Sequence, residues 1–347
     1  MTSKIDPIYQ ELAARIREAD SEYMPRILAK LANLEQARIL RALPDPDRDA
    51  SAGRSLKVSE EFAEKLGLAK EVVDKHLREL FEKGVVFPTR AGPQMARTWM
   101  QLHDSTLANP KFDTSLGDEF FDLWSMAHQK SRMPLASGIR PQSAPMRVLP
   151  KWQAIKDIPG ILPCEDMREI IKAQELLVLI HCGCKRSYRE RQCGIPDESC
   201  ITVGRTAQYN LERGLGRKIT HEQALEIIGK FNQYPIINLV VNQRDVGQLI
   251  CNCHSCCCGA LKEGVASSRF IATVDAEKCR ACQTCVERCQ FGAAKLQYYP
   301  EIGAERACVD TELCLGCGDC VISCPHGARS MKLVRPPEHI PETLSIY

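Results

Sequence analysis

The sequence predicts a multidomain protein of the α+β class, and three observations lead to that prediction. Apolar residues recur at helical spacing in the N-terminal part, helix and strand patterns alternate in the middle, and a cysteine motif is repeated near the C-terminus. We therefore expect a helical region, a Pro-rich linker, a small cysteine-rich α/β domain and a C-terminal domain, at residues 1–130, 131–163, 164–264 and 265–347.

Charge and hydropathy exclude some classes of partner. The chain has 347 residues, with 46 Lys and Arg against 44 Asp and Glu, and a net charge of +2 gives no reason to expect a polyanion or an anionic membrane. The N-terminus MTSKIDPIYQ lacks the apolar core of a signal peptide. The apolar runs LLVLI and PIINLVV are too short to cross a bilayer. We expect a cytoplasmic protein with no membrane span.

The N-terminal region contains an ordered series of elements. Helical spacing in IYQELAARIREA and MPRILAKLANLEQARIL is followed by a loop rich in Pro, Asp, Ser and Gly. We then expect a short strand at 56–58, a helix capped by Ser59, a turn at Gly67, a helix ending near Lys83, and a hairpin over VVFPTRAGPQMART. That order resembles a winged helix-turn-helix, over roughly residues 25–100.

The resemblance raises the question of DNA binding, and the charges answer it. Between Lys70 and Lys83 four basic residues are matched by four acidic ones, whereas a recognition helix carries surplus positive charge to meet phosphates. We expect this module to serve in packing or docking, with DNA an unlikely partner.

Cysteine usage indicates metal. The chain has 19 cysteines, none of them before Cys164, and an odd number argues against a framework of disulfides. Thiolates gathered in one part of an intracellular protein most often hold a metal.

In the middle domain, two strands run into cysteines. A helix precedes the strand ELLVLI and another precedes PIINLVV, which suggests parallel pairing. The loops that leave neighbouring parallel strands converge at one sheet edge. The two groups of cysteines would then meet and supply the ligands of one further centre, drawn from Cys182, Cys184, Cys193, Cys200, Cys251, Cys253, Cys256, Cys257 and Cys258.

Several interpretations of these nine cysteines stay open. They hold an additional iron–sulfur cluster, or a zinc ion, or they are inert thiols. His181 and His254 flank the two groups, as ligands or as hydrogen-bonding residues. Cys257-Cys258-Gly259 resembles the CCG modules of heterodisulfide-reductase-like proteins, which hold unusual clusters and handle thiols.

The most specific pattern lies near the C-terminus. CRACQTCVERC and CLGCGDCVISCP both have the spacing C-x2-C-x2-C-x3-C, and they form an internal repeat. Residues 270–334 resemble bacterial-type ferredoxins with two [4Fe–4S] clusters, whose fourth cysteine in each run binds the other cluster. The resemblance implies one cluster on Cys279, Cys282, Cys285 and Cys324 and another on Cys314, Cys317, Cys320 and Cys289.

Three departures from that family stand out. Gln290 replaces the proline found at Pro325, so we expect a looser turn after Cys289. A loop over roughly 297–308 lengthens the link between the halves, and Cys308 within it is a surplus, half-buried thiol. The side chains near the two runs differ, so the two clusters should differ in potential.

These features predict an iron–sulfur electron-transfer protein, or the electron-transfer subunit of a cytoplasmic redox complex, working with a redox partner protein. The chain resembles ferredoxin-domain iron–sulfur proteins of anaerobic bacteria. No G-x-G-x-x-G follows a strand, and no G-x-x-x-x-G-K-[ST] occurs. Two other classes remain: a redox-sensing transcription regulator acting through the winged helix, and a reductase of thiols, disulfides or activated substrates acting at the middle cysteines.

Overall fold

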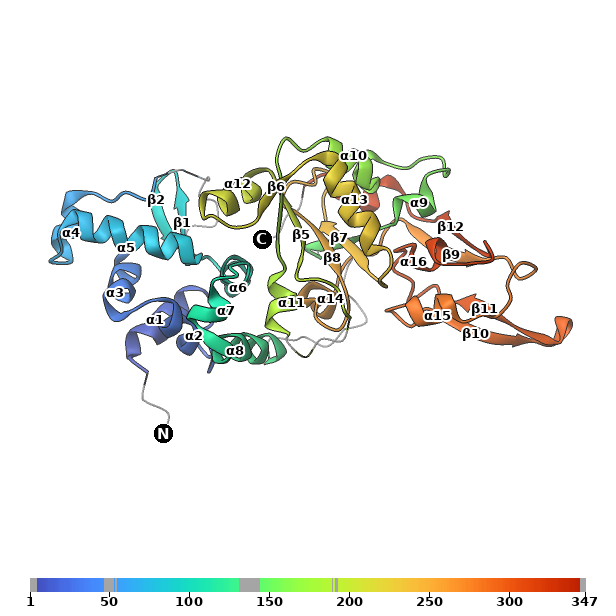
Figure 1. Ribbon diagram of the computed structural model, residues 1–347, viewed down its shortest axis with the longest axis horizontal. Coiled ribbons are helices and arrows are strands. Elements are labelled where there is room, and N and C mark those ends of the chain that lie inside the picture. The colour runs from blue at the N-terminus through green and yellow to red at the C-terminus, as the bar shows by residue number, and fades with distance from the viewer. Residues whose placement is uncertain are drawn as a thin grey trace. The chain divides into compact units, whose positions relative to one another are not determined.

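The computed structural model describes residues 5–46, 53, 55–130, 144–188, 190 and 193–343 (Figure 1). Its mixture of helices and strands fits the predicted α+β class. The chain divides into two compact units. The first contains residues 1–132, 181–190 and 212–215, and the second contains the rest.

The first unit is mainly helical. Its core is formed by apolar side chains at helical spacing, among them Leu12, Leu28, Leu77 and Trp124. Its elements are α1 (Pro7–Arg15), α2 (Met24–Leu31), α3 (Leu34–Ala42), α4 (Glu60–Lys65), α5 (Lys70–Lys83), β1 (Val86–Thr89), β2 (Gly92–Met95), α6 (Trp99–Leu107), α7 (Phe112–Ser115), α8 (Gly117–Lys130) and α11 (Gly183–Ser187).

The helix pair and hairpin expected near residue 60 are present. Ser59 Oγ caps α4 by accepting from the backbone N–H of Phe62 at 3.2 Å, and α5 ends at Gly84 in the left-handed conformation, with φ of 86°. Antiparallel β1 and β2 follow. The strand expected at 56–58 is wrong, because these residues form no strand and Leu56 and Val58 pack against the helical core instead.

Segment 181–190 joins this unit through a buried arginine. Nη2 of Arg186, on α11, donates to the carbonyl of Asn109 and to Oδ1 of Asp113, both at 3.1 Å. The buried Arg186 therefore holds α11 against the segment around α7. A contact between such distant segments leaves no periodic signal in the sequence.

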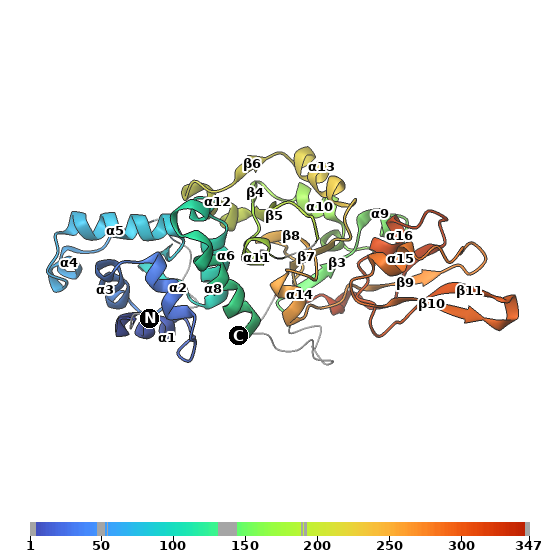
Figure 2. The ribbon, with the colours of Figure 1, turned by 60° about the horizontal axis from the view of Figure 1, so that its bottom comes forward.

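A six-stranded sheet with helices packed against it forms the larger part of the second unit (Figures 1 and 2). The strand order in the sheet is β3-β7-β8-β5-β4-β6. The elements are β3 (Met146–Leu149), α9 (Trp152–Ile155), α10 (Met167–Lys172), β4 (Leu177–His181), β5 (Glu198–Val203), α12 (Gly204–Glu212), β6 (Arg217–Ile219), α13 (His221–Phe231), β7 (Ile237–Val241), β8 (Leu249–Cys253) and α14 (Gly259–Glu263).

The predicted parallel pairing of ELLVLI with PIINLVV is wrong. These two strands, β4 and β7, are separated in the sheet by β8 and β5. The segment after β7 returns at once as β8, which pairs antiparallel with both β7 and β5. A connection this short can only form a hairpin, since a parallel crossover needs a dozen or more residues.

Part of the region predicted as a linker is folded. Residues 131–143 lie outside the described residues, but β3 pairs antiparallel with β7 at the edge of the sheet. Val148 and Leu149 are fully buried there. The Pro-rich composition led to a linker prediction where the short strand β3 is present.

The two faces of the sheet are covered differently. On one face, α10 and α13 pack against Ile201 of β5 and Ile250 of β8. On the other, Cys253 of β8 lies in a cluster with Leu239, with Leu261 of α14 and with residues from the C-terminal part of the chain. Because side chains alternate along a strand, Cys251 and Cys253 share this second face.

The C-terminal part is built from two antiparallel strand pairs and two short helices. Strand β9 pairs with β12 and β10 with β11. The residues predicted as a loop at 297–308 instead extend this second pair as a hairpin. The elements are β9 (Phe270–Val274), α15 (Thr284–Arg288), β10 (Ala294–Tyr299), β11 (Ala304–Val309), α16 (Asp319–Ile322) and β12 (Arg329–Leu333).

Candidate iron–sulfur site

The two cysteine runs fold into matching turns. Ala281 and Gln283 of the first run have positive φ angles of 52° and 65°, and Gly316 and Gly318 hold the equivalent positions of the second. Such φ values are costly for non-glycine residues and persist only where the surroundings require them. At Gly316 a Cβ atom would lie 2.0 Å from the carbonyl oxygen of Phe270, so only glycine fits.

One pocket gathers cysteines from both runs. It is lined by Cys279, Cys282 and Cys285 of the first run and by Cys324 of the second. Four thiols converging on one pocket suit the ligand set of a [4Fe–4S] cluster.

Backbone donors point at these sulfurs. The N–H of Ala307 donates to Sγ of Cys279 and the N–H of Ala328 to Sγ of Cys324, each at 3.3 Å. Donors of this kind stabilise thiolates, which are the form that binds metal. The residues present therefore fit an iron–sulfur cluster.

An ion pair joins the two segments of the second predicted set, which is Cys314, Cys317, Cys320 and Cys289. Arg288 and Asp319, which directly precede Cys289 and Cys320, form a two-pronged contact at 2.9 and 3.0 Å. Asp319 is almost fully buried. This contact fixes the end of α15 against α16.

Burial and neighbouring thiols raise the pKa values of two cysteines of the second predicted set. Burial, with the thiols of Cys314 and Cys289 nearby, raises the pKa of Cys320 to about 12. Burial and the Cys320 thiol also raise the pKa of Cys317. Cys317 and Cys320, with pKa values raised in this way, would be protonated without a metal, and metal binding would displace the two protons.

The two sets differ in exposure. Cys282 of the first set is exposed, and a hydrogen bond with Thr284 lowers the pKa of its thiol. The cysteines of the second set are buried or half-buried. Solvent exposure is one of the factors that set cluster potential.

The sequence comparisons bear on this region. Residues 278–328 match the 4Fe-4S dicluster domain family. The match spans both cysteine runs, so the predicted ferredoxin-like module and its iron–sulfur character are confirmed. We call residues 278–328 the dicluster module. No curated protein matches the chain.

The middle cysteines of the second unit form two adjacent groups. The sulfurs of Cys193, Cys256 and Cys257 lie within 4.8 Å of one another. The other group surrounds Cys251, whose thiol is hydrogen-bonded to Cys200 and Cys253 and lies near Cys258; the first of these bonds and burial raise its pKa well above the usual value. Seven of the nine predicted residues are thus placed in one unit, and many clustered thiols support metal binding.

The other predicted candidates are placed as follows. Cys182 and Cys184 belong to the first unit, where Cys182 is buried at the start of α11. Nδ1 of His254 accepts from the backbone N–H of Cys256 at 3.1 Å, a hydrogen-bonding role. His181 is half-buried at the end of β4. Cys308 is half-buried, as expected.

The dicluster module contacts the segments that carry the middle cysteines. Cys317 packs into the apolar cluster that contains Cys253 and Cys258. Gln290 accepts from the backbone N–H of Ser255 and donates to the carbonyl of Pro235. The looser turn expected after Cys289 is not observed, because the N–H of Gly292 donates to the carbonyl of Cys289 at 3.4 Å, much as the N–H of Gly327 donates to that of Cys324 at 3.3 Å.

Within the described ranges, no helix is both long and apolar enough to span a bilayer.

Proposed function

We propose that the chain is an iron–sulfur electron-transfer protein, or the electron-transfer subunit of a cytoplasmic redox complex. Cys279, Cys282, Cys285 and Cys324 would hold one [4Fe–4S] cluster, and Cys314, Cys317, Cys320 and Cys289 the other. Clusters bound there would supply single-electron transfer. The pocket shared by the first run and Cys324 supports this division of ligands.

We further propose that the middle cysteines of the second unit hold an additional iron–sulfur cluster. The observation that carries this step is the packing of Cys317 against the apolar cluster that contains Cys253 and Cys258. Cys317, a proposed ligand of the dicluster module, would thereby lie near the middle thiols. The Gln290–Ser255 hydrogen bond joins the dicluster module to the segment that carries Cys256 and Cys257.

A redox partner protein would meet the exposed edge of the first set. Cys282 is the exposed cysteine of that set, whereas no cysteine of the second set is exposed and Cys317 packs against the cluster that contains Cys253 and Cys258. In this proposal, Cys282 marks the outer end for electron exchange and Cys317 the inner end.

Reductive titration tests the proposed function. We expect the anaerobically purified chain to take up about one electron for each cluster from dithionite and to return them to an oxidised viologen. Electron paramagnetic resonance of the reduced chain should show the corresponding signals. An iron-loaded chain that could not be reduced and reoxidised in this way would contradict the proposal.

A further inference from the structure

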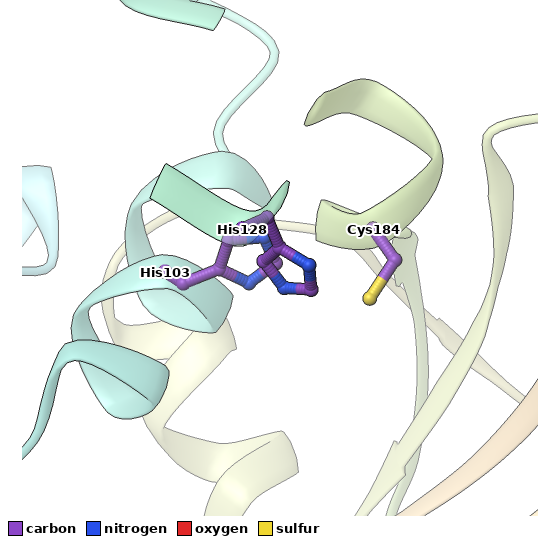
Figure 3. A group of neighbouring side chains, drawn as sticks. All are labelled: His103, His128 and Cys184. Carbon is purple, nitrogen blue, oxygen red and sulfur yellow. The ribbon is translucent and has the colours of Figure 1, made fainter. Parts of the chain in front are cut away.

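Two histidines and one cysteine meet in the first unit, in a region whose sequence carries no metal motif. His103 lies on α6, His128 on α8 and Cys184 on α11. One donor atom from each lies within 4.8 Å of the other two. Figure 3 shows the imidazole rings side by side, with the sulfur of Cys184 facing them.

A close helix contact brings Cys184 to this place. A Cβ atom at Gly183 would lie 3.3 Å from Cβ of Leu107 and 3.5 Å from Cε1 of His103, tighter than ordinary contact in the first case. Glycine lets α11 approach α6. The bonds from Arg186 to Asn109 and Asp113 hold α11 there.

The histidines are oriented as metal-binding histidines are. Nδ1 of His103 lies 2.9 Å from Oδ1 of Asp104, and Nδ1 of His128 lies 3.2 Å from the hydroxyl of Tyr188. A carboxylate next to Nδ1 places the proton on that nitrogen and leaves a lone pair on Nε2.

One ring nitrogen of His103 is buried without a hydrogen-bond partner among the described residues. This nitrogen is Nε2, and the side chain of His103 is fully buried. Leaving such a buried group unsatisfied is destabilising. A metal ion bound to Nε2 would satisfy it.

The surroundings select the kind of metal. Trp99 packs edge-on against His128 with ring centres 5.3 Å apart, and Trp124 packs edge-on against His103 at 5.2 Å. Nitrogen and sulfur donors in apolar walls suit zinc, whereas magnesium and calcium require oxygen ligands.

We propose that His103, His128 and Cys184 form a mononuclear Zn²⁺ site in the first unit. Two neutral imidazoles and one thiolate leave a fourth tetrahedral position for water or a small ligand. This site is separate in its ligands from every iron–sulfur site proposed above, and it goes beyond electron transfer.

Element-specific X-ray absorption on the full-length, anaerobically purified chain tests the site without any substitution. We expect about 1 zinc per chain, bound by one sulfur and three nitrogen or oxygen atoms. Zinc surrounded by four sulfurs would place the ion elsewhere and overturn the proposal. So would a chain that holds no zinc and takes up none when one equivalent of Zn²⁺ is added.

Variants then assign the ligands. His103→Asn, His128→Gln and Cys184→Ser should each lower the zinc content to under about a tenth, while the iron content stays unchanged because other thiolates hold it. His76→Gln, a histidine of the same unit paired with Glu35 at 2.8 Å, is the matched control and should keep its zinc. Folded ligand variants that retain zinc would overturn the proposal, and if the variants do not fold, the absorption spectrum of the unaltered chain decides.

Discussion

The guanidinium of Arg329 donates a hydrogen bond to Sγ of Cys285 at 2.9 Å. Arg329 is buried at the start of β12, so little solvent screens its charge. Its charge and its hydrogen bond would both favour the more negative, reduced form of a cluster bound to that sulfur.

Arg329→Gln should therefore lower the reduction potential of the cluster at Cys285 more than that of the other cluster, where the Arg329 charge acts on Cys320 without a hydrogen bond. We expect a shift of about 50–100 mV to more negative values, since 59 mV corresponds to a tenfold change for one electron. Potentiometric titration followed by paramagnetic resonance measures it. Lys332→Gln, an exposed residue of the same strand, is the control, and an equal shift in both variants would contradict the argument.

Crossed ligation gives a second prediction. Cys289→Ser should weaken the cluster of Cys314, Cys317 and Cys320 and leave the nearer run intact. Spectra of the reduced variant should lose one signal and keep the other. Cys308→Ser, a half-buried thiol of the same module, should change neither. Loss of the signal from Cys279, Cys282 and Cys285 would refute the assignment.

Gln290 gives a third prediction. Gln290→Leu removes the hydrogen bonds to Ser255 and Pro235, each of which contributes about 1 kcal/mol. We expect the unfolding midpoint at a fixed heating rate to fall by about 5 °C, with faster loss of iron to a chelator. Gln297→Leu, on the exposed hairpin strand β10, should have no effect. Equal behaviour of the two variants would show that Gln290 does not stabilise the contact.

The sequence predicted the dicluster module well because its ligands are local. Three of the four cysteines in each set lie within a short turn, and the spacing itself encodes the geometry. The pairing of β4 with β7 was mispredicted because strand order depends on which segments pair over long distances in the chain. The apolar patterns of β4 and β7 do not specify their partners.

The site at His103 depends even more on contacts between segments that are distant in the sequence. Its three residues lie on separate helices, with no regular spacing between them. Gly183 and Arg186 position Cys184 in this site. The sequence does not show this role, because Gly183 contacts Leu107 and Arg186 binds Asp113 only in the folded chain. Seven middle cysteines, by contrast, could be predicted as candidates from their density alone.

The winged-helix resemblance leads to a fourth prediction. Lys70 is paired with Asp74 at 2.5 Å. Lys83 donates to the carbonyl of Leu31, and burial lowers its pKa. Two of the four basic residues on α5 are thus already engaged. We expect the anaerobically prepared chain to show no sequence-selective binding to genomic fragments in gel-shift experiments at about 150 mM salt. Selective, salt-sensitive retardation would favour the transcription regulator instead.

The middle cysteines give the fifth prediction. Two [4Fe–4S] clusters in the dicluster module account for about 8 irons, and one further cluster of this kind would raise the total to about 12. A double substitution, Cys256→Ser with Cys257→Ser, removes two of the three thiols that lie within 4.8 Å of one another. It should lower iron by about 4 and leave the two ferredoxin-type signals in place, because other thiolates hold those clusters.

Cys164→Ser is the matched control for that experiment, because Cys164 is a buried thiol outside both groups of middle cysteines, and it should keep about 12 irons. Iron near 8 in the unaltered chain would remove the third cluster from the proposal. A loss of zinc instead of iron in the double variant would identify the middle site as a zinc centre. The zinc proposed at His103 would not confuse the result, because its ligands are untouched by the double substitution and its zinc should persist.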